Sequence, residues 1–110
     1  MQKYLNKVSK RKIVITGGKG LLGSSFYNKY KKQYIIIRYP HRIEYFSKFK
    51  KWLKNKNFNY FIHFAALTKS ESIKRKKSLN LINIKSTINL IKNLNEEKIR
   101  NFKYFLFISS

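Results

Sequence analysis

The sequence predicts an α/β fold built on a parallel sheet, and three observations support this prediction. Short apolar runs of strand length recur along the chain, and segments with helical spacing of apolar residues separate them. The runs are largely continuous rather than alternating, as in strands covered on both faces. A glycine-rich loop joins the first run to the first helical segment, as in nucleotide-binding βα units. The clearest runs are residues 13–15, 34–37, 60–66 and 104–110.

Composition limits the chain to one domain. It has 110 residues, of which 43% are hydrophobic, so it can form a core and is not globally disordered. The absence of cysteine excludes disulfides, thiolate metal sites and a cysteine nucleophile. No stretch has the length of a signal sequence or a membrane span, so we expect a cytoplasmic chain with no membrane partner. Residues 1–11 form a basic lead-in and residues 12–110 the domain.

The charge is strongly basic, with 26 Lys and Arg against 4 acidic residues and a net charge of +22. Such an excess favours binding to polyanions, because neutralising phosphates dominates non-specific nucleic-acid affinity. However, the lysines are scattered, and no nucleic-acid-binding motif is present. The joint excess of Lys, Asn, Ile, Tyr and Phe is typical of an A+T-rich coding sequence. We therefore expect no specific nucleic-acid partner.

The glycine loop has the spacing of a dinucleotide cradle. Gly17 permits a sharp turn, Gly20 leaves room for a pyrophosphate, and Gly23 lets the following helix approach the strand. The backbone N–H groups as far as Leu21 and Leu22 would then face the phosphates at the positive end of the helix. A plain turn is the alternative interpretation, but the apolar strand before the loop and the amphipathic helix after it favour the cradle.

The end of the second run bears on the choice of cofactor. Arg38 lies ~20 residues after the first glycine, where an acid favours NAD and a base favours NADP. The chain contains no Asp, and no Glu precedes Glu44. Arg42 is near enough in the sequence to assist Arg38. We therefore predict a nicotinamide dinucleotide, NAD(P), with a preference for NADP.

The T-G-x-x-G-x-x-G spacing, Thr16 to Gly23, resembles that of the extended short-chain dehydrogenase/reductase family, which includes NAD-dependent epimerases, dehydratases and sugar-nucleotide reductases. After Pro40, residues 41–44 fit a short third strand. In the family this strand ends in Asp and an aliphatic residue that touch the adenine. Here the pair is Arg42-Ile43, so only Ile43 matches. We expect a helix over residues 46–55 to follow, and His41 to be a surface residue.

A second signature, residues 60–66, resembles the family's fourth strand, V-I-H-x-A-A. The resemblance implies that the backbone of Phe64, Ala65 and Ala66 passes beside the cofactor. His63 matches the family histidine, and its place inside a strand indicates a structural role. Thr68 follows in a loop that would line the cofactor or substrate side.

A third signature, residues 83–91, resembles the family pattern N-V-x-G-T-x-N-L-L on a long helix, with Ser86 in place of glycine. The resemblance implies that Asn83 braces the active site through hydrogen bonds. The alternative is an ordinary polar residue in an asparagine-rich chain. Helical spacing predicts that the core face of this helix consists of Leu81, Ile84, Ile88 and Ile91.

The last run resembles the family's fifth strand, which ends in two hydroxyl residues. By this match Ser110 is the catalytic hydroxyl and Ser109 its neighbour at the cofactor. The family's Tyr-x-x-x-Lys pair has no equivalent after this strand. The string from Tyr27 to Lys31 has this spacing, but it lies on the helix after the cradle and is interpreted as a chance match.

The resemblance extends from Lys12 to Ser110 and implies a Rossmann-like parallel sheet, of order 3-2-1-4-5, with helices on both faces and truncated after the fifth strand. A bare fifth strand would promote association, including a homodimer. The implied function is the NAD(P)-binding portion of a nucleotide-sugar epimerase, dehydratase or reductase. The branch of the dTDP-4-dehydrorhamnose reductases is the most similar, because the link between the second and fourth strands is compact. The alternatives are a non-catalytic nucleotide-binding remnant and a basic polyanion-binding module.

Overall fold

A computed structural model describes residues 10–64, 76–99 and 101–108, and for residues 76–83 it describes the backbone only. Four strands and three helices alternate along the described chain. Each predicted apolar run overlaps one of the strands. The elements are β1 (Lys12–Thr16), α2 (Leu21–Tyr30), β2 (Ile35–Arg38), α3 (Phe46–Leu53), β3 (Tyr60–His63), α5 (Lys76–Glu97) and β4 (Tyr104–Phe107).

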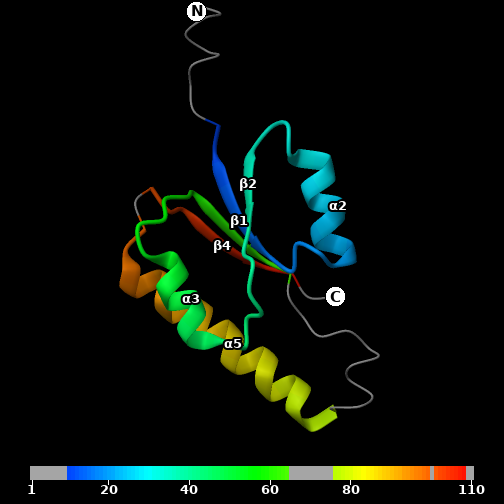
Figure 1. The fold of residues 1–110 in the computed structure, drawn as a ribbon, viewed down its shortest axis with the longest axis vertical. Helices are drawn as coiled ribbons and strands as arrows, with labels where there is room; N and C mark the ends of the chain where they lie inside the picture. The colour runs from blue at the N-terminus through cyan, green and yellow to red at the C-terminus, as the bar shows by residue number, and fades with distance from the viewer. Residues whose placement is uncertain (1–9, 65–75, 100, 109–110) are drawn as a thin grey trace, which may run out of the picture.

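The strands form one parallel sheet of order β2-β1-β3-β4. Helix α2 covers one face, and α3 and α5 cover the other (Figure 1). This arrangement confirms the predicted parallel α/β sheet with helices on both faces. The carboxyl ends of β1, β2 and β3 lie at the same edge, and the glycine loop leaves the sheet there.

The predicted third strand is wrong, so the order 3-2-1-4-5 lacks its first member among the described residues. Residues 41–44 form a turn in which the Tyr45 N–H donates to the Arg42 carbonyl at 3.2 Å. The side chains of Arg42 and Glu44 form an ion pair across the turn. Pro40 has no N–H to donate to a sheet, which disfavours a strand at this point. The remaining order agrees with the prediction.

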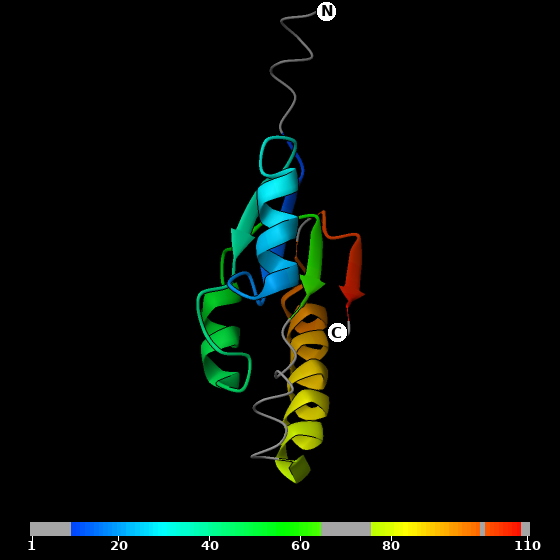
Figure 2. The ribbon, with the colours of Figure 1, turned by 90° about the vertical axis from the view of Figure 1, so that its right-hand side faces the viewer.

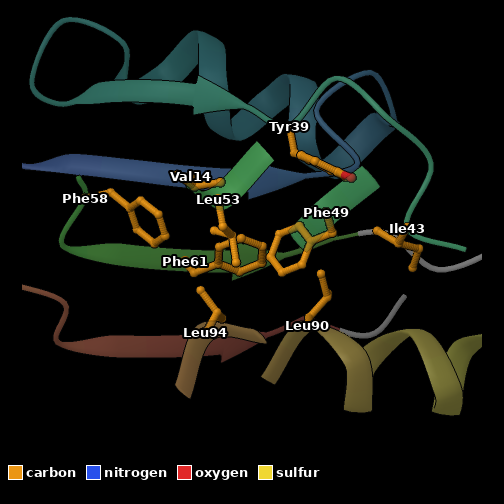
Figure 3. Close-up of a cluster of buried hydrophobic side chains, with 9 residues drawn as sticks. All are labelled: Val14, Tyr39, Ile43, Phe49, Leu53, Phe58, Phe61, Leu90 and Leu94. Atoms are coloured by element: carbon orange, nitrogen blue, oxygen red, sulfur yellow. The ribbon is translucent and has the colours of Figure 1, made fainter. Parts of the chain in front are cut away.

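The core lies between the sheet and the helices α3 and α5 (Figure 3). Its aromatic rings meet mostly edge to face, as Tyr39 does on Phe49, with ring centroids 5.3 Å apart. Such pairs stabilise a fold by about 0.5–1.5 kcal/mol beyond their burial. The buried cluster consists of Val14, Tyr39, Ile43, Phe49, Leu53, Phe58, Phe61, Leu90 and Leu94.

The predicted core face of α5 is also wrong. Ile84, Ile88 and Ile91 are 58%, 59% and 42% exposed, whereas Leu90 and Leu94 are buried. The side chain of Leu81 lies outside the described residues. Helix α5 carries apolar residues on two sides, so spacing alone does not choose between them. Ser86, which is small and fully buried, lies on the side of α5 that faces the core, where it lets the helix pack closely against the core.

Strand β4 is at one edge of the sheet, as expected for the last run. On the face that carries α2, no described helix covers it (Figure 2), and Tyr104 and Leu106 are 64% and 48% exposed. A groove of about 390 Å³ between α2 and the sheet is lined in part by Tyr30, Tyr60 and Tyr104. None of the described helices combines the length and the apolar character that a membrane crossing requires.

Candidate dinucleotide site

The glycine loop makes a tight and internally bonded turn between β1 and α2. Gly17 has φ of 68°, a left-handed conformation that glycine adopts without strain. The Gly20 N–H donates to the Gly17 carbonyl at 3.0 Å. The Ser24 hydroxyl donates back to the Gly18 carbonyl at 3.1 Å, which fixes the loop against the first turns of α2.

Gly20 and Gly23 are glycines for different reasons. A Cβ on Gly23 would lie 2.1 Å from the Gly17 carbonyl oxygen, so the close contact between helix and loop requires glycine. A Cβ on Gly20 would lie 3.4 Å from that oxygen, an ordinary contact. Packing within the protein therefore does not explain Gly20. The space beside it is available to a ligand, as the cradle interpretation requires.

The amino end of α2 is electrostatically prepared for an anion. Its N-cap residue, Gly20, makes no side-chain cap hydrogen bond, and the first turn contains no acidic residue. The N–H groups of the first turn of a helix have no partners within the helix, and they carry the positive end of its dipole. Leu21 and Leu22, at the start of the helix, are 85% and 44% exposed. Both residues are therefore accessible beside the loop, where the sequence placed them.

Arg38 ends β2 beside the glycine loop. Its guanidinium carbon lies 4.2 Å from the centroid of the Tyr27 ring, on α2. Its aliphatic part lies against Gly18, where a Cβ would approach the Arg38 side chain to 2.8 Å. By contrast, Arg42 is paired with Glu44. Of the two arginines considered in the sequence, Arg38 is thus the one in contact with the loop.

A buried polar pair joins the carboxyl ends of β1 and β3. Thr16 Oγ1 and His63 Nδ1 are 2.6 Å apart, and both side chains are only 1% exposed. Burial lowers the pKa of His63 from 6.5 to about 4, because the charged ring would lose its hydration. The histidine is therefore neutral near pH 7 and holds the two strands together, which agrees with its predicted structural role.

Ile43, predicted at the adenine side, and Phe64, which follows β3, lie on opposite faces of the sheet. Ile43 is buried in the core beside Phe49. Phe64 follows β3, where its N–H donates to the Thr16 carbonyl at 3.3 Å and its ring meets Phe26 of α2. Tyr39, next to Arg38, is buried, and burial raises its pKa to about 12, so its hydroxyl stays protonated.

The structure leaves several predicted site residues undescribed. Ala65, Ala66, Ser109 and Ser110 lie outside the described residues, as does Thr68. Asn83 lies in α5, but its side chain is not described. The described cradle residues, with Arg38, gather at the carboxyl edge of the sheet. No role in binding was predicted from the sequence for Gly18 or Tyr27. The one signal in the sequence was that Gly18 is a second glycine directly after Gly17.

Comparison with solved structures places this fold. The hyperthermophile Thermotoga maritima UDP-glucose 4-epimerase superposes with a TM-score of 0.74 at 20% identity over 90% of this chain and 38% of that one. The Stenotrophomonas maltophila UDP-glucose 4-epimerase, solved with bound NAD, gives 0.72 at 18% over 91% and 37%. The Bacillus anthracis dTDP-4-dehydrorhamnose reductase in complex with NADP gives 0.71 at 21% over 89% and 36%. This chain has the fold of these enzymes.

The resemblance to the extended short-chain dehydrogenase/reductase family is thus confirmed at the level of fold. This chain spans less than two fifths of the length of these proteins. No family model matches the sequence, and no curated protein matches it significantly. Epimerases and a reductase superpose about equally well, so the branch within the family stays a prediction.

Proposed function

We propose that this chain binds a nicotinamide dinucleotide, with NADP preferred, as the nucleotide-binding portion of an enzyme of the epimerase, dehydratase or reductase type. The observation that carries the proposal is the contrast within the glycine loop. Gly23 is required by packing, whereas Gly20 is next to free space at the amino end of α2. A pyrophosphate approaching the backbone requires this combination of a close helix and an open glycine.

The described residues would divide the work of binding. The N–H groups of the first turn of α2 would donate to the pyrophosphate, while the exposed Leu21 and Leu22 would exclude water beside it. Arg38 would pair with a phosphate on the adenine ribose, since guanidinium groups bind phosphates through several charge-assisted hydrogen bonds. The fold neighbours include proteins solved with NAD and with NADP, which supports the class of cofactor.

The wider activity is proposed from the resemblance. A bound nicotinamide would supply hydride transfer, and the partner of the reaction would be a nucleotide sugar, as in the neighbour solved with UDP-glucose. Ser110 is the hydroxyl assigned by the resemblance, with Asn83, Ala65, Ala66 and Ser109 near the cofactor. Tyr27 and Lys31 are not assigned the role of the family's acid–base pair, because Tyr27 lies on α2, the helix after the cradle, with Lys31 as its C-cap.

Calorimetric titration of the chain with NADP and NAD tests the proposal. We expect Gly20→Val to abolish binding of both, because a branched side chain would fill the space beside the pyrophosphate. Ser25→Val is the matched control, since it places the same side chain on an exposed position of the same helix. It should leave binding unchanged. Equal affinities for the Gly20→Val chain and the wild type would refute the proposal.

The titration distinguishes the polyanion-binding alternative from the proposal, and an additional assay for turnover distinguishes the non-catalytic remnant. A non-catalytic remnant would bind the cofactor without turnover of any nucleotide sugar. A polyanion-binding module has one observation in its favour: the net charge is +22, and among the described Lys and Arg side chains only Arg42 forms an ion pair, with Glu44. It predicts nucleic-acid binding that weakens steeply with salt and does not respond to Gly20→Val.

A further inference from the structure

Contacts with Tyr27 and Gly18 define the position of the Arg38 side chain, and a dinucleotide cradle does not by itself require these contacts. Its guanidinium carbon lies 4.2 Å from the Tyr27 ring centroid, well within the ~6 Å limit of a cation–π contact. Lys31 lies over the same ring at 5.8 Å, one helical turn away. The contact with Tyr27 restricts the Arg38 side chain, which has four rotatable bonds, to one side of the loop.

Gly18 completes this position. A Cβ at residue 18 would come within 2.8 Å of both Cγ and Cδ of Arg38, and within 3.2 Å of its Cβ. Any larger residue would push the arginine away from the loop. Neither the turn at Gly17 nor the close packing at Gly23 accounts for a glycine here. We call Tyr27 and Gly18 together the Arg38 seat.

The described residues offer the positive charge of Arg38 little electrostatic compensation. Gly18 is two residues before the N-cap of α2, at the positive end of the helix dipole. Among the described acidic residues, Glu44 is paired with Arg42, and Glu96 and Glu97 end α5 on the other face of the sheet (Figure 1). An arginine held beside a positive helix end favours an anion as its partner.

We propose that the Arg38 seat sets cofactor choice, by holding the guanidinium in place for the phosphate on the adenine ribose of NADP. The inference rests on the proposed dinucleotide function and deepens it. Tyr27 and Gly18 act as positioning residues, since neither needs to touch the cofactor. Preorganising the arginine reduces the rotamer entropy that binding would otherwise cost, so the gain appears for NADP and not for NAD.

Calorimetric Kd values for NADP and NAD, measured on folded variants of the full chain, test the seat. We expect Tyr27→Leu and Gly18→Ala each to weaken NADP binding about two- to fivefold, the range of an exposed cation–π contact. NAD binding should not change. Tyr27→Phe keeps a ring under the guanidinium and should restore the wild-type ratio of affinities.

Tyr30→Leu is the matched control. It removes a tyrosine of the same helix that also carries a cation, Lys29, at 5.5 Å from its ring centroid. Because that pair does not involve Arg38, the ratio of NADP to NAD affinity should stay at the wild-type value. A second control combines Tyr27→Leu with Arg38→Met. Once the guanidinium is absent, the loss of the ring should have no further effect on NADP.

The outcomes separate the two proposals. If the wild-type chain binds neither dinucleotide, the proposed function fails and the seat fails with it. If the chain binds both, and Tyr27→Leu weakens them equally or weakens neither, the seat alone is overturned. An equal effect of Tyr27→Leu with and without Arg38 would also overturn it. Loss of NADP affinity that requires Arg38 supports the seat.

Discussion

The buried histidine makes the stability of the fold depend on pH. His63 has a pKa of about 4 in the folded chain against 6.5 in an exposed histidine. Below pH 6.5 the unfolded chain therefore binds a proton that the folded chain does not, so stability falls as the pH falls and levels off near pH 4. A difference of this size corresponds to at most about 3 kcal/mol in the free energy of unfolding.

Urea denaturation followed by circular dichroism measures this dependence. Between pH 6.5 and 4.5 we expect the free energy of unfolding of the wild type to fall by about 2 kcal/mol from this group. Moderate salt at constant ionic strength would screen the repulsion among the lysines. His63→Asn places a neutral amide near the position of Nδ1, where it can still bond to Thr16 Oγ1. This variant should lose the steep part of the profile.

His41→Asn is the control, because it makes the same change at the exposed histidine of the chain. Its profile should follow that of the wild type. A wild-type profile that is flat over this interval, or a His63→Asn profile as steep as the wild type, would refute the reasoning. So would a flattening produced by His41→Asn instead.

Two further predictions concern packing. Gly23→Ala should lower the free energy of unfolding by more than about 2 kcal/mol in thermal unfolding, because its Cβ would lie 2.1 Å from the Gly17 oxygen. Gly20→Ala should lower it by less than about 1 kcal/mol. Similar losses for the two variants would contradict the loop geometry. Leu90→Ala should cost about 2–5 kcal/mol in urea denaturation, because Leu90 is fully buried on α5. The exposed Ile88→Ala should cost under about 1 kcal/mol, and the reverse ranking would restore the isoleucine face as the core face.

The sequence was sufficient for features that depend on local chemistry. The apolar runs that became β1, β2, β3 and β4 were found because parallel strands covered by helices are continuously apolar. The glycine loop was found because a sharp turn, the approach of a pyrophosphate and close helix packing each require a glycine at a set spacing. The third strand was predicted because residues 41–44 fit a short strand between Pro40 and the next helix. It failed because Pro40 and the Arg42–Glu44 pair favour a turn.

Other features depend on contacts that a sequence does not display. The buried side of α5 depends on how the helix rotates onto α3 and the sheet, and both of its sides carry apolar residues. The contact between Arg38 and Tyr27 joins residues from two elements. A tyrosine four residues before a lysine is common in a lysine-rich chain, so its spacing gave no reason to assign it a role.

The pairing of β3 with β4 has a consequence for the handling of this chain. The two strands read Y-F-I-H and Y-F-L-F, and their parallel register places like beside like at the first three positions, with the Tyr60 and Tyr104 rings stacked at an interplanar angle of 3°. The outer edge of β4 offers the same uncharged pattern to any further strand. In-register stacking of like residues is the geometry of cross-β assemblies. Repulsion between the positively charged chains opposes such pairing, so high salt would favour growth of the sheet from one chain to the next.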